Sequence, residues 1–76
     1  MSFMKTRRER PLTIREINIV FLIVDGFNPA DMAAIMDISK NSVRNHISNI
    51  NHKWGTYGRA SILAEAWRQG LGNVNN

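Results

Sequence analysis

The stretch ISKNSVRNHISNINHKWG, residues 38–55, is predicted to form one helix with two unlike sides. Ser39 is a suitable N-cap and Gly55 a suitable stop, so we expect the helix to end near Trp54. Apolar residues recur along it at helical spacing (i, i+4, i+7 and i+11). This apolar side, which we expect to face a core, consists of Val43, Ile47, Ile50 and Trp54.

The other side of this helix is polar and carries no acid from residue 40 to residue 54. Surface helices usually hold more Glu and Lys than Asn and Ser, which are poor helix formers. Arg and Asn side chains can read guanine and adenine, and a face without carboxylates does not repel phosphate. The residue types favour nucleic-acid contact over an ordinary solvated face, which is the alternative. The polar side consists of Asn41, Arg44, Asn45, Ser48 and His52.

Three further helices are predicted, and no strand or repeat. Thr13 and Glu16 form a capping-box pattern, and Asn28 followed by Pro29 is a second helix start. A short helix, a three-residue link and the longer polar helix make a helix-turn-helix arrangement. The expected fold is therefore a small all-α domain with four helices, at residues 14–25, 29–36, 40–54 and 58–69.

The 76 residues suffice for one small domain, and the charge along them is uneven. Residues 1–12 carry a net charge of +3, residues 13–37 carry −3 and residues 38–76 carry +4. A basic arm and a basic C-terminal half suggest a polyanion met by two surfaces. We expect a flexible basic arm at 1–11, the domain at 12–71 and a frayed tail at 72–76.

Paired arginines followed by the apolar run at 19–24 give a crude likeness to a secretion signal. We reject it, because the run is only six residues long and cleavage would leave roughly 45 residues with little core. No segment approaches the ~20 apolar residues of a membrane span. The absence of cysteine fits a reducing cytosol. Together with the suggested contact to a polyanion, it leads us to expect a cytoplasmic, nucleoid-associated protein.

A series of landmarks runs without a gap through residues 12–71: Leu12-Thr13-x-Arg15-Glu16, Gly26, Asp31-Met32-Ala33, Ile38-Ser39, Ser42-Val43-Arg44-x-His46, Asn49-Ile50, Lys53, Gly55, Arg59 and Gly70-Leu71. In these landmarks the segment resembles the DNA-binding domain of the LuxR/GerE family of bacterial transcription regulators. The resemblance implies four helices, with the third in the major groove and the fourth at a dimer contact. We expect a standalone, GerE-like member. Departures from the family pattern are Asn18, Pro29, Trp54 and Gly58.

The resemblance assigns base reading to Arg44, Asn45 and Ser48, and the polar side adds Asn41. Side chains beside them are expected to meet phosphates: Lys40, Ser42, Asn49, His52 and Lys53. The basic side chains of the arm either follow DNA into a minor groove or only solubilise the chain. They are Lys5, Arg7, Arg8 and Arg10.

The predicted fourth helix has an apolar stripe, part of which must cover the core. The family resemblance implies that the rest pairs with a second copy, so that a homodimer reads an inverted repeat. The alternative, that the whole stripe is core, suits Leu63 and Ala66 better than Trp67. The expected dimer interface consists of Ile62, Leu63, Ala66 and Trp67.

The predicted first helix has two apolar stripes. One stripe matches the family's core positions, but the second falls where the family usually has polar residues or Pro. We hypothesise that the second stripe binds RNA polymerase, a larger LuxR-type regulator or a second copy. The alternative function is accordingly a protein-interaction adaptor that modulates such a regulator. The second stripe consists of Ile14, Ile17 and Phe21.

No arrangement for enzyme chemistry is evident, and no cofactor is indicated. Ser42 and Ser61 lack a neighbouring base with an orienting group, so neither is a candidate nucleophile. His46 and His52 are six residues apart on different sides of a helix, which makes a shared metal ion improbable. We therefore expect a binding protein.

Overall fold

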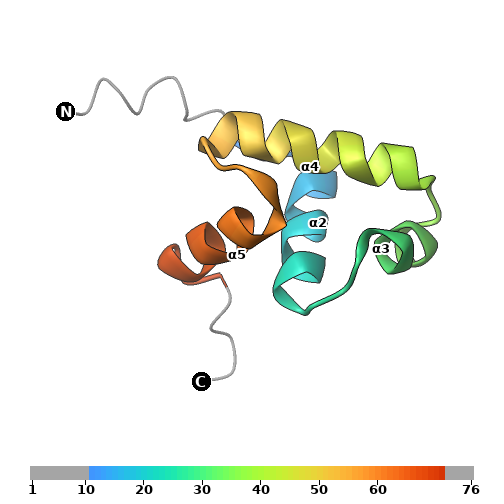
Figure 1. Ribbon diagram of the computed structural model, residues 1–76, viewed down its shortest axis with the longest axis horizontal. Coiled ribbons are helices and arrows are strands. Elements are labelled where there is room, and N and C mark those ends of the chain that lie inside the picture. Colours follow the sequence, from blue (N-terminus) through green and yellow to red (C-terminus); the bar gives the residue numbers. More distant parts are fainter. Residues whose placement is uncertain (1–10, 72–76) are drawn as a thin grey trace.

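Four helices make up the part of the chain that the computed structural model describes, residues 11–71, and that part contains no strand (Figure 1). They are α2 (Ile14–Val24), α3 (Pro29–Met36), α4 (Lys40–Trp54) and α5 (Gly58–Arg68). The expected all-α fold and its four helices are confirmed, each to within a residue. The predictions for residues 1–10 and 72–76 lie outside the described residues.

Local capping explains where the first three helices begin. The Thr13 hydroxyl accepts from the Glu16 backbone N–H at 3.1 Å, and the Glu16 carboxylate accepts from the Thr13 N–H at 2.8 Å. Asn28 caps α3, and the Ser39 hydroxyl caps α4 by accepting from the Ser42 N–H at 3.0 Å. Each such cap stabilises a helix by about 1 kcal/mol. The helix starts are thus encoded within four-residue segments.

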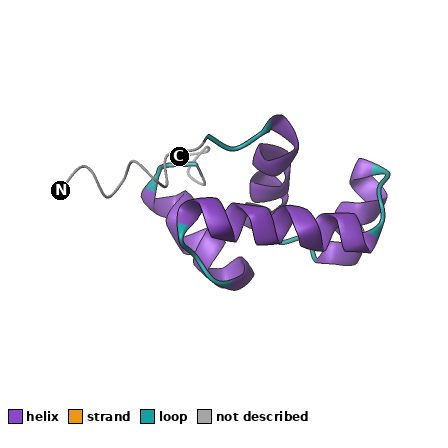
Figure 2. Cartoon of the chain, turned by 90° about the horizontal axis from the view of Figure 1, so that it is seen from above, coloured by secondary structure: helices purple, strands orange, loops and turns teal. Residues whose placement is uncertain are grey.

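The core forms where α2, α3 and α5 all pack on the same side of α4 (Figures 1 and 2). Val43 and Ile50 of α4 are fully buried. The far side of α4 is covered by no other helix and its side chains are exposed. The other core residues come from all three partner helices: Ile19, Val20, Ile23, Met32, Ala33, Ile62 and Ala66.

The turn between α3 and α4 depends on a left-handed residue. Asp37 has φ +59°, a conformation that Asp adopts more readily than most residues other than Gly and Asn. From this turn the Ile38 backbone N–H donates to the Ala33 carbonyl at 3.0 Å, which closes the end of α3. This reversal sets α4 at its angle to α3.

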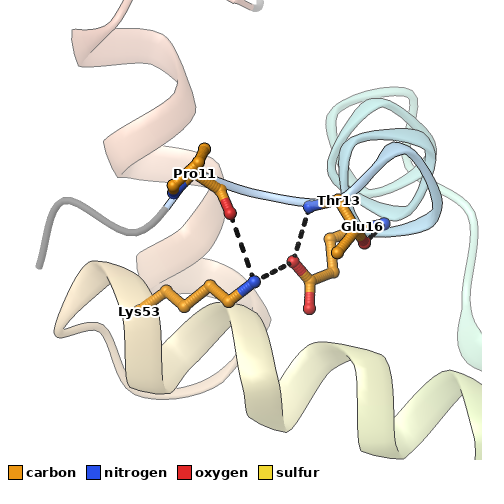
Figure 3. A network of polar contacts seen from close by, with 4 residues as sticks. All are labelled: Pro11, Thr13, Glu16 and Lys53. Atoms are coloured by element: carbon orange, nitrogen blue, oxygen red, sulfur yellow. Dashed lines mark hydrogen bonds and ion pairs between the residues drawn. The ribbon is translucent and has the colours of Figure 1, made fainter.

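A buried ion pair joins the last turn of α4 to the first turn of α2 (Figure 3). The Lys53 Nζ lies 2.8 Å from the Glu16 Oε1 and donates to the Pro11 carbonyl at 3.2 Å. Burial by itself raises the pKa of the Glu16 carboxyl. The Lys53 ammonium and the Thr13 backbone N–H outweigh burial, so the pKa lies below its ordinary value.

We predict that this pair makes the fold sensitive to acid. Because the pKa of Glu16 is lower in the folded chain than in the unfolded one, its contribution is complete above the ordinary Glu pKa of about 4.3. That contribution is lost as the pH falls through the lower, folded value. In urea unfolding at pH 7 and pH 3, Glu16→Gln should lose less stability on acidification than the wild type does.

The matched control is Glu65→Gln, which alters a carboxylate at the surface, paired with Arg68 within one helix. Glu65→Gln should lower the free energy of unfolding by less than about 1 kcal/mol at pH 7. Glu16→Gln should lower the free energy of unfolding by about 1–3 kcal/mol at the same pH, since it leaves the largely buried Lys53 ammonium without its ionised partner. Equal acid sensitivity in wild type and Glu16→Gln would contradict this assignment.

Candidate nucleic-acid interface

The far side of α4 is one continuous polar face, here called the α4 face. Helix geometry accounts for it, since Val43 and Ile50 point into the core and residues near the opposite pole point outward. All four side chains predicted to read bases are exposed and lie on this face. The α4 face consists of Lys40, Asn41, Arg44, Asn45, Ser48, Asn49 and His52.

The first turn of α4 presents donors. Backbone N–H groups of a first turn have no acceptor within their own helix, apart from the one that a cap engages. Lys40 is exposed beside them. The half-buried Ser42 hydroxyl accepts from the Ser39 hydroxyl at 3.1 Å, so it lies beside the cap rather than on the α4 face. This end of α4 can therefore receive an anion.

Lys53, which was expected to contact phosphate, is directed toward the protein instead. Its side chain is only 17% exposed and its ammonium is engaged by Glu16 and by the Pro11 carbonyl. The position lies at the edge of the apolar side, where a long side chain can reach either solvent or a neighbouring helix. We therefore leave Lys53 out of the candidate contacts and assign its ammonium to the fold.

A hollow of about 400 Å³ lies at the C-terminal end of the α4 face. It joins Ser48 and His52 to the turn before α5. In that turn the Thr56 hydroxyl donates to the Asn51 side-chain oxygen at 2.7 Å, and Tyr57 is 87% exposed. Tyr57 was not predicted from the sequence, although an aromatic residue between two glycines in one turn was a usable signal.

Of the four residues expected at a dimer contact, two are core residues. Ile62 and Ala66 are fully buried within the chain, so they cannot reach a second copy without unfolding. Leu63 is half-buried, and Trp67 is 53% exposed. The prediction is corrected accordingly: the part of α5 open to a partner is the Trp67 side with the edge of Leu63.

The N-terminal arm joins the domain near the C-terminal end of α4, because the Pro11 carbonyl is held by Lys53 (Figure 3). The predicted DNA contacts of Lys5, Arg7, Arg8 and Arg10 lie outside the described residues. Within residues 11–71 no group of three or more His, Cys, Asp or Glu side chains could hold a metal ion. The helices of this same range are all too short to cross a membrane.

The family model for bacterial regulatory proteins of the luxR family matches residues 10–66. Spore germination protein GerE of Bacillus subtilis (strain 168) is 39% identical over 59 residues, which cover 78% of this chain and 80% of GerE. Transcriptional regulatory protein DegU of Brevibacillus brevis is 29% identical over 73 residues, or 92% of this chain and 31% of DegU.

A third relative is the HTH-type transcriptional regulator MalT of Yersinia pestis (strain Pestoides F). It is 31% identical over 61 residues, which cover 80% of this chain and 7% of MalT. No solved structure is significantly similar to the chain. The similarity to DegU and MalT is thus confined to a small part of each of those proteins, whereas it extends over most of GerE.

Proposed function

The chain belongs to the luxR family of bacterial regulatory proteins, and we propose that it regulates transcription by inserting α4 into the major groove of DNA. The observation that carries this proposal is the α4 face, which is open to solvent and free of carboxylates. A helix of 15 residues is about 22 Å long and fits a groove about 12 Å wide. The other three helices pack on the opposite side of α4, so they do not prevent the α4 face from entering the groove.

In this arrangement the side chains divide into two groups. Asn41, Arg44, Asn45 and Ser48 face base edges, where Arg reads guanine and Asn reads adenine. The remaining contacts go to phosphates, which set the register of α4 without reading sequence. We assign phosphate contacts to Lys40, the backbone at Ser42, Asn49, His52 and, in addition to the earlier expectations, Tyr57.

We further propose that two copies pair through α5 when they bind DNA. Trp67 of α5 is a large aromatic side chain that is 53% exposed, and aromatic anchors dominate such contacts. In Figure 1, α5 lies at the end of the domain away from α3. A two-fold pair presents two α4 helices and reads half-sites about 34 Å apart in an inverted repeat. The basic arm, which joins the domain at Pro11 beside the last turn of α4, adds salt-dependent attraction to the DNA backbone.

Arg44→Ala tests base reading. Loss of the bidentate contact between Arg44 and guanine should weaken binding to the preferred sequence by about 1–3 kcal/mol. It should also relax the preference at one base pair in each half-site. The matched control is Lys40→Ala, which removes an exposed cation from the same helix. Lys40→Ala should weaken binding to all sequences about equally and make it less dependent on salt. Competition binding with single-base operator variants measures both effects.

The assignment of Arg44 is wrong if Arg44→Ala changes the affinity for every operator variant by the same factor. Both substitutions are at exposed positions, so the free energy of unfolding should change by less than about 0.5 kcal/mol. Unfolding curves of the two variants separate a loss of contact from a loss of fold.

Trp67→Glu tests pairing through α5. A charge placed in the contact should leave a monomer that binds one half-site, with at least about tenfold weaker affinity for the full inverted repeat. Trp67→Phe keeps an apolar aromatic anchor and should retain pairing. Sedimentation of the protein on DNA with one or two half-sites measures the stoichiometry. Unaltered two-copy binding by Trp67→Glu would rule out this contact.

A further inference from the structure

Helix α2 is apolar on two opposite sides, and only one of them is used by the fold. Ile19, Val20 and Ile23 on the core side are at most 5% exposed. On the opposite side lie Ile14, 77% exposed, and Phe21, 40% exposed, with Ile17 between them at 39%. A surface helix normally turns a polar side to water. We call the exposed set Ile14, Ile17 and Phe21 the α2 stripe.

The α2 stripe continues into a groove between α2 and α3. The groove encloses about 430 Å³ and has no acidic residue in its lining. Ile35 on its α3 side is 54% exposed, which extends the apolar surface beyond α2. Its lining consists of Arg15, Asn18, Phe21, Leu22, Ile35 and Met36.

Opposite charges stand at the two ends of α2. Arg15 lies in the first turn at one flank of the stripe, and Asp25 is the C-cap residue in line with Ile14 and Phe21. Both are exposed, and the two ion pairs found among residues 11–71 involve other side chains. Ten residues of helix separate them by about 15 Å. The surface therefore runs from a cation, over apolar side chains, to an anion.

Such a surface is complementary to itself when one helix is reversed. We propose that the α2 stripe is a contact between two copies of the chain, in which α2 packs antiparallel against its twin. Arg15 then faces the partner subunit's Asp25 at both ends of a two-fold contact. The partner subunit's Phe21 meets the Arg15–Asn18 end of the groove, where a guanidinium can lie over its ring.

This contact is compatible with DNA binding. The stripe lies opposite the core side of α2, while the α4 face belongs to a different helix and the proposed α5 contact involves Trp67. A helix of 11 residues is about 16 Å long and about 10 Å wide, far below the roughly 800 Å² per partner of a stable interface. The contact is consequently weak in solution and effective between copies held side by side.

One consequence of the contact rests on the function proposed above. Dimers bound at adjacent sites on one duplex meet at high effective concentration, so that a weak contact suffices to link them. Two different two-fold contacts on each chain, through α5 and through α2, join copies into rows. We expect adjacent operator sites on one face of the duplex to be filled cooperatively.

The test reverses the charge at one end of α2 at a time. In a Trp67→Glu background, which removes pairing through α5, Arg15→Asp and Asp25→Arg are each made alone. Both place a charge favourably for the helix dipole, so α2 is not expected to unfold. Sedimentation equilibrium without DNA, at up to about 1 mM chain, measures self-association.

Each single variant should self-associate about tenfold more weakly than the parent, because it places like charges opposite each other at both ends. An equimolar mixture of the two variants should recover association, because one chain then carries an acid at each end of α2 and the other carries a base at each end. In the same mixture Phe21→Gln on both chains should abolish the recovery. DNA affinity for a single half-site should stay within about threefold of the parent for all of them.

The proposal is overturned if the parent shows no self-association, or if the mixture associates no better than each variant alone. If Phe21→Gln abolishes transcriptional output while the mixture fails to associate, the α2 stripe serves another protein and the self-contact is wrong. Failure of half-site binding by the parent, with association intact, would instead contradict only the proposed DNA function.

Discussion

The structure depends on the requirement that α4 bury one side completely while its other side stays uncovered. Val43 and Ile50 lie in the core formed by all four helices, and together they carry no exposed surface. The helices α2, α3 and α5 pack on one side of α4, so they supply this core without enclosing α4. The α4 face is therefore a consequence of how the core is built. It needs no separate scaffold, and its residue types are free to serve a ligand.

The Glu16–Lys53 pair fixes the position of α4 along its length. Hydrophobic packing is non-directional and allows helices to slide, whereas a buried ion pair with hydrogen bonds at 2.8 Å permits little displacement. Glu16 also belongs to the capping box of α2, so one carboxylate links the start of α2 to the end of α4. The same ammonium holds the Pro11 carbonyl and so places the last residue of the arm near the C-terminal end of α4.

The four helices could be predicted because their signals are local. Thr13, Asn28 and Ser39 each engage a backbone N–H three residues on, which a reader of the sequence can see directly. The partner of Lys53 could not be found this way, since Glu16 is 37 residues distant and only the packing of α2 on α4 brings them together. The helical period places Lys53 at the boundary of the polar side, so a phosphate contact is what the sequence predicts for it.

The correction of the predicted dimer contact on α5 has a similar cause, because burial depends on packing between helices. Spacing shows that Ile62 and Trp67 belong to an apolar helix side, but not how far across that side the neighbouring helices extend. In the structure α5 packs against α2 and α4; Ile62 is fully buried, whereas Trp67 is 53% exposed. The second apolar side of α2 was recognisable from spacing alone. The fraction of this side that stays exposed to solvent could be learned only from the fold.

Charge is divided among the helices in a way that agrees with the two binding surfaces proposed above. The acids of residues 13–37 lie on α2, α3 and their caps, and one of them is neutralised by Lys53. The helix that carries the α4 face has none. In the function proposed above, a polyanion is attracted to the α4 face, while apolar area and paired charges decide what contacts the α2 stripe.

The most direct measurement is selection from a pool of random duplexes at near-physiological salt, followed by sequencing of the bound fraction. Enrichment of an inverted repeat is expected, with half-sites one helical turn apart and a G·C preference at the base pair that Arg44 contacts. Binding that is strong at low salt, weak at high salt and without an enriched sequence would reflect backbone attraction alone. That result would contradict the claim that the α4 face reads DNA sequence.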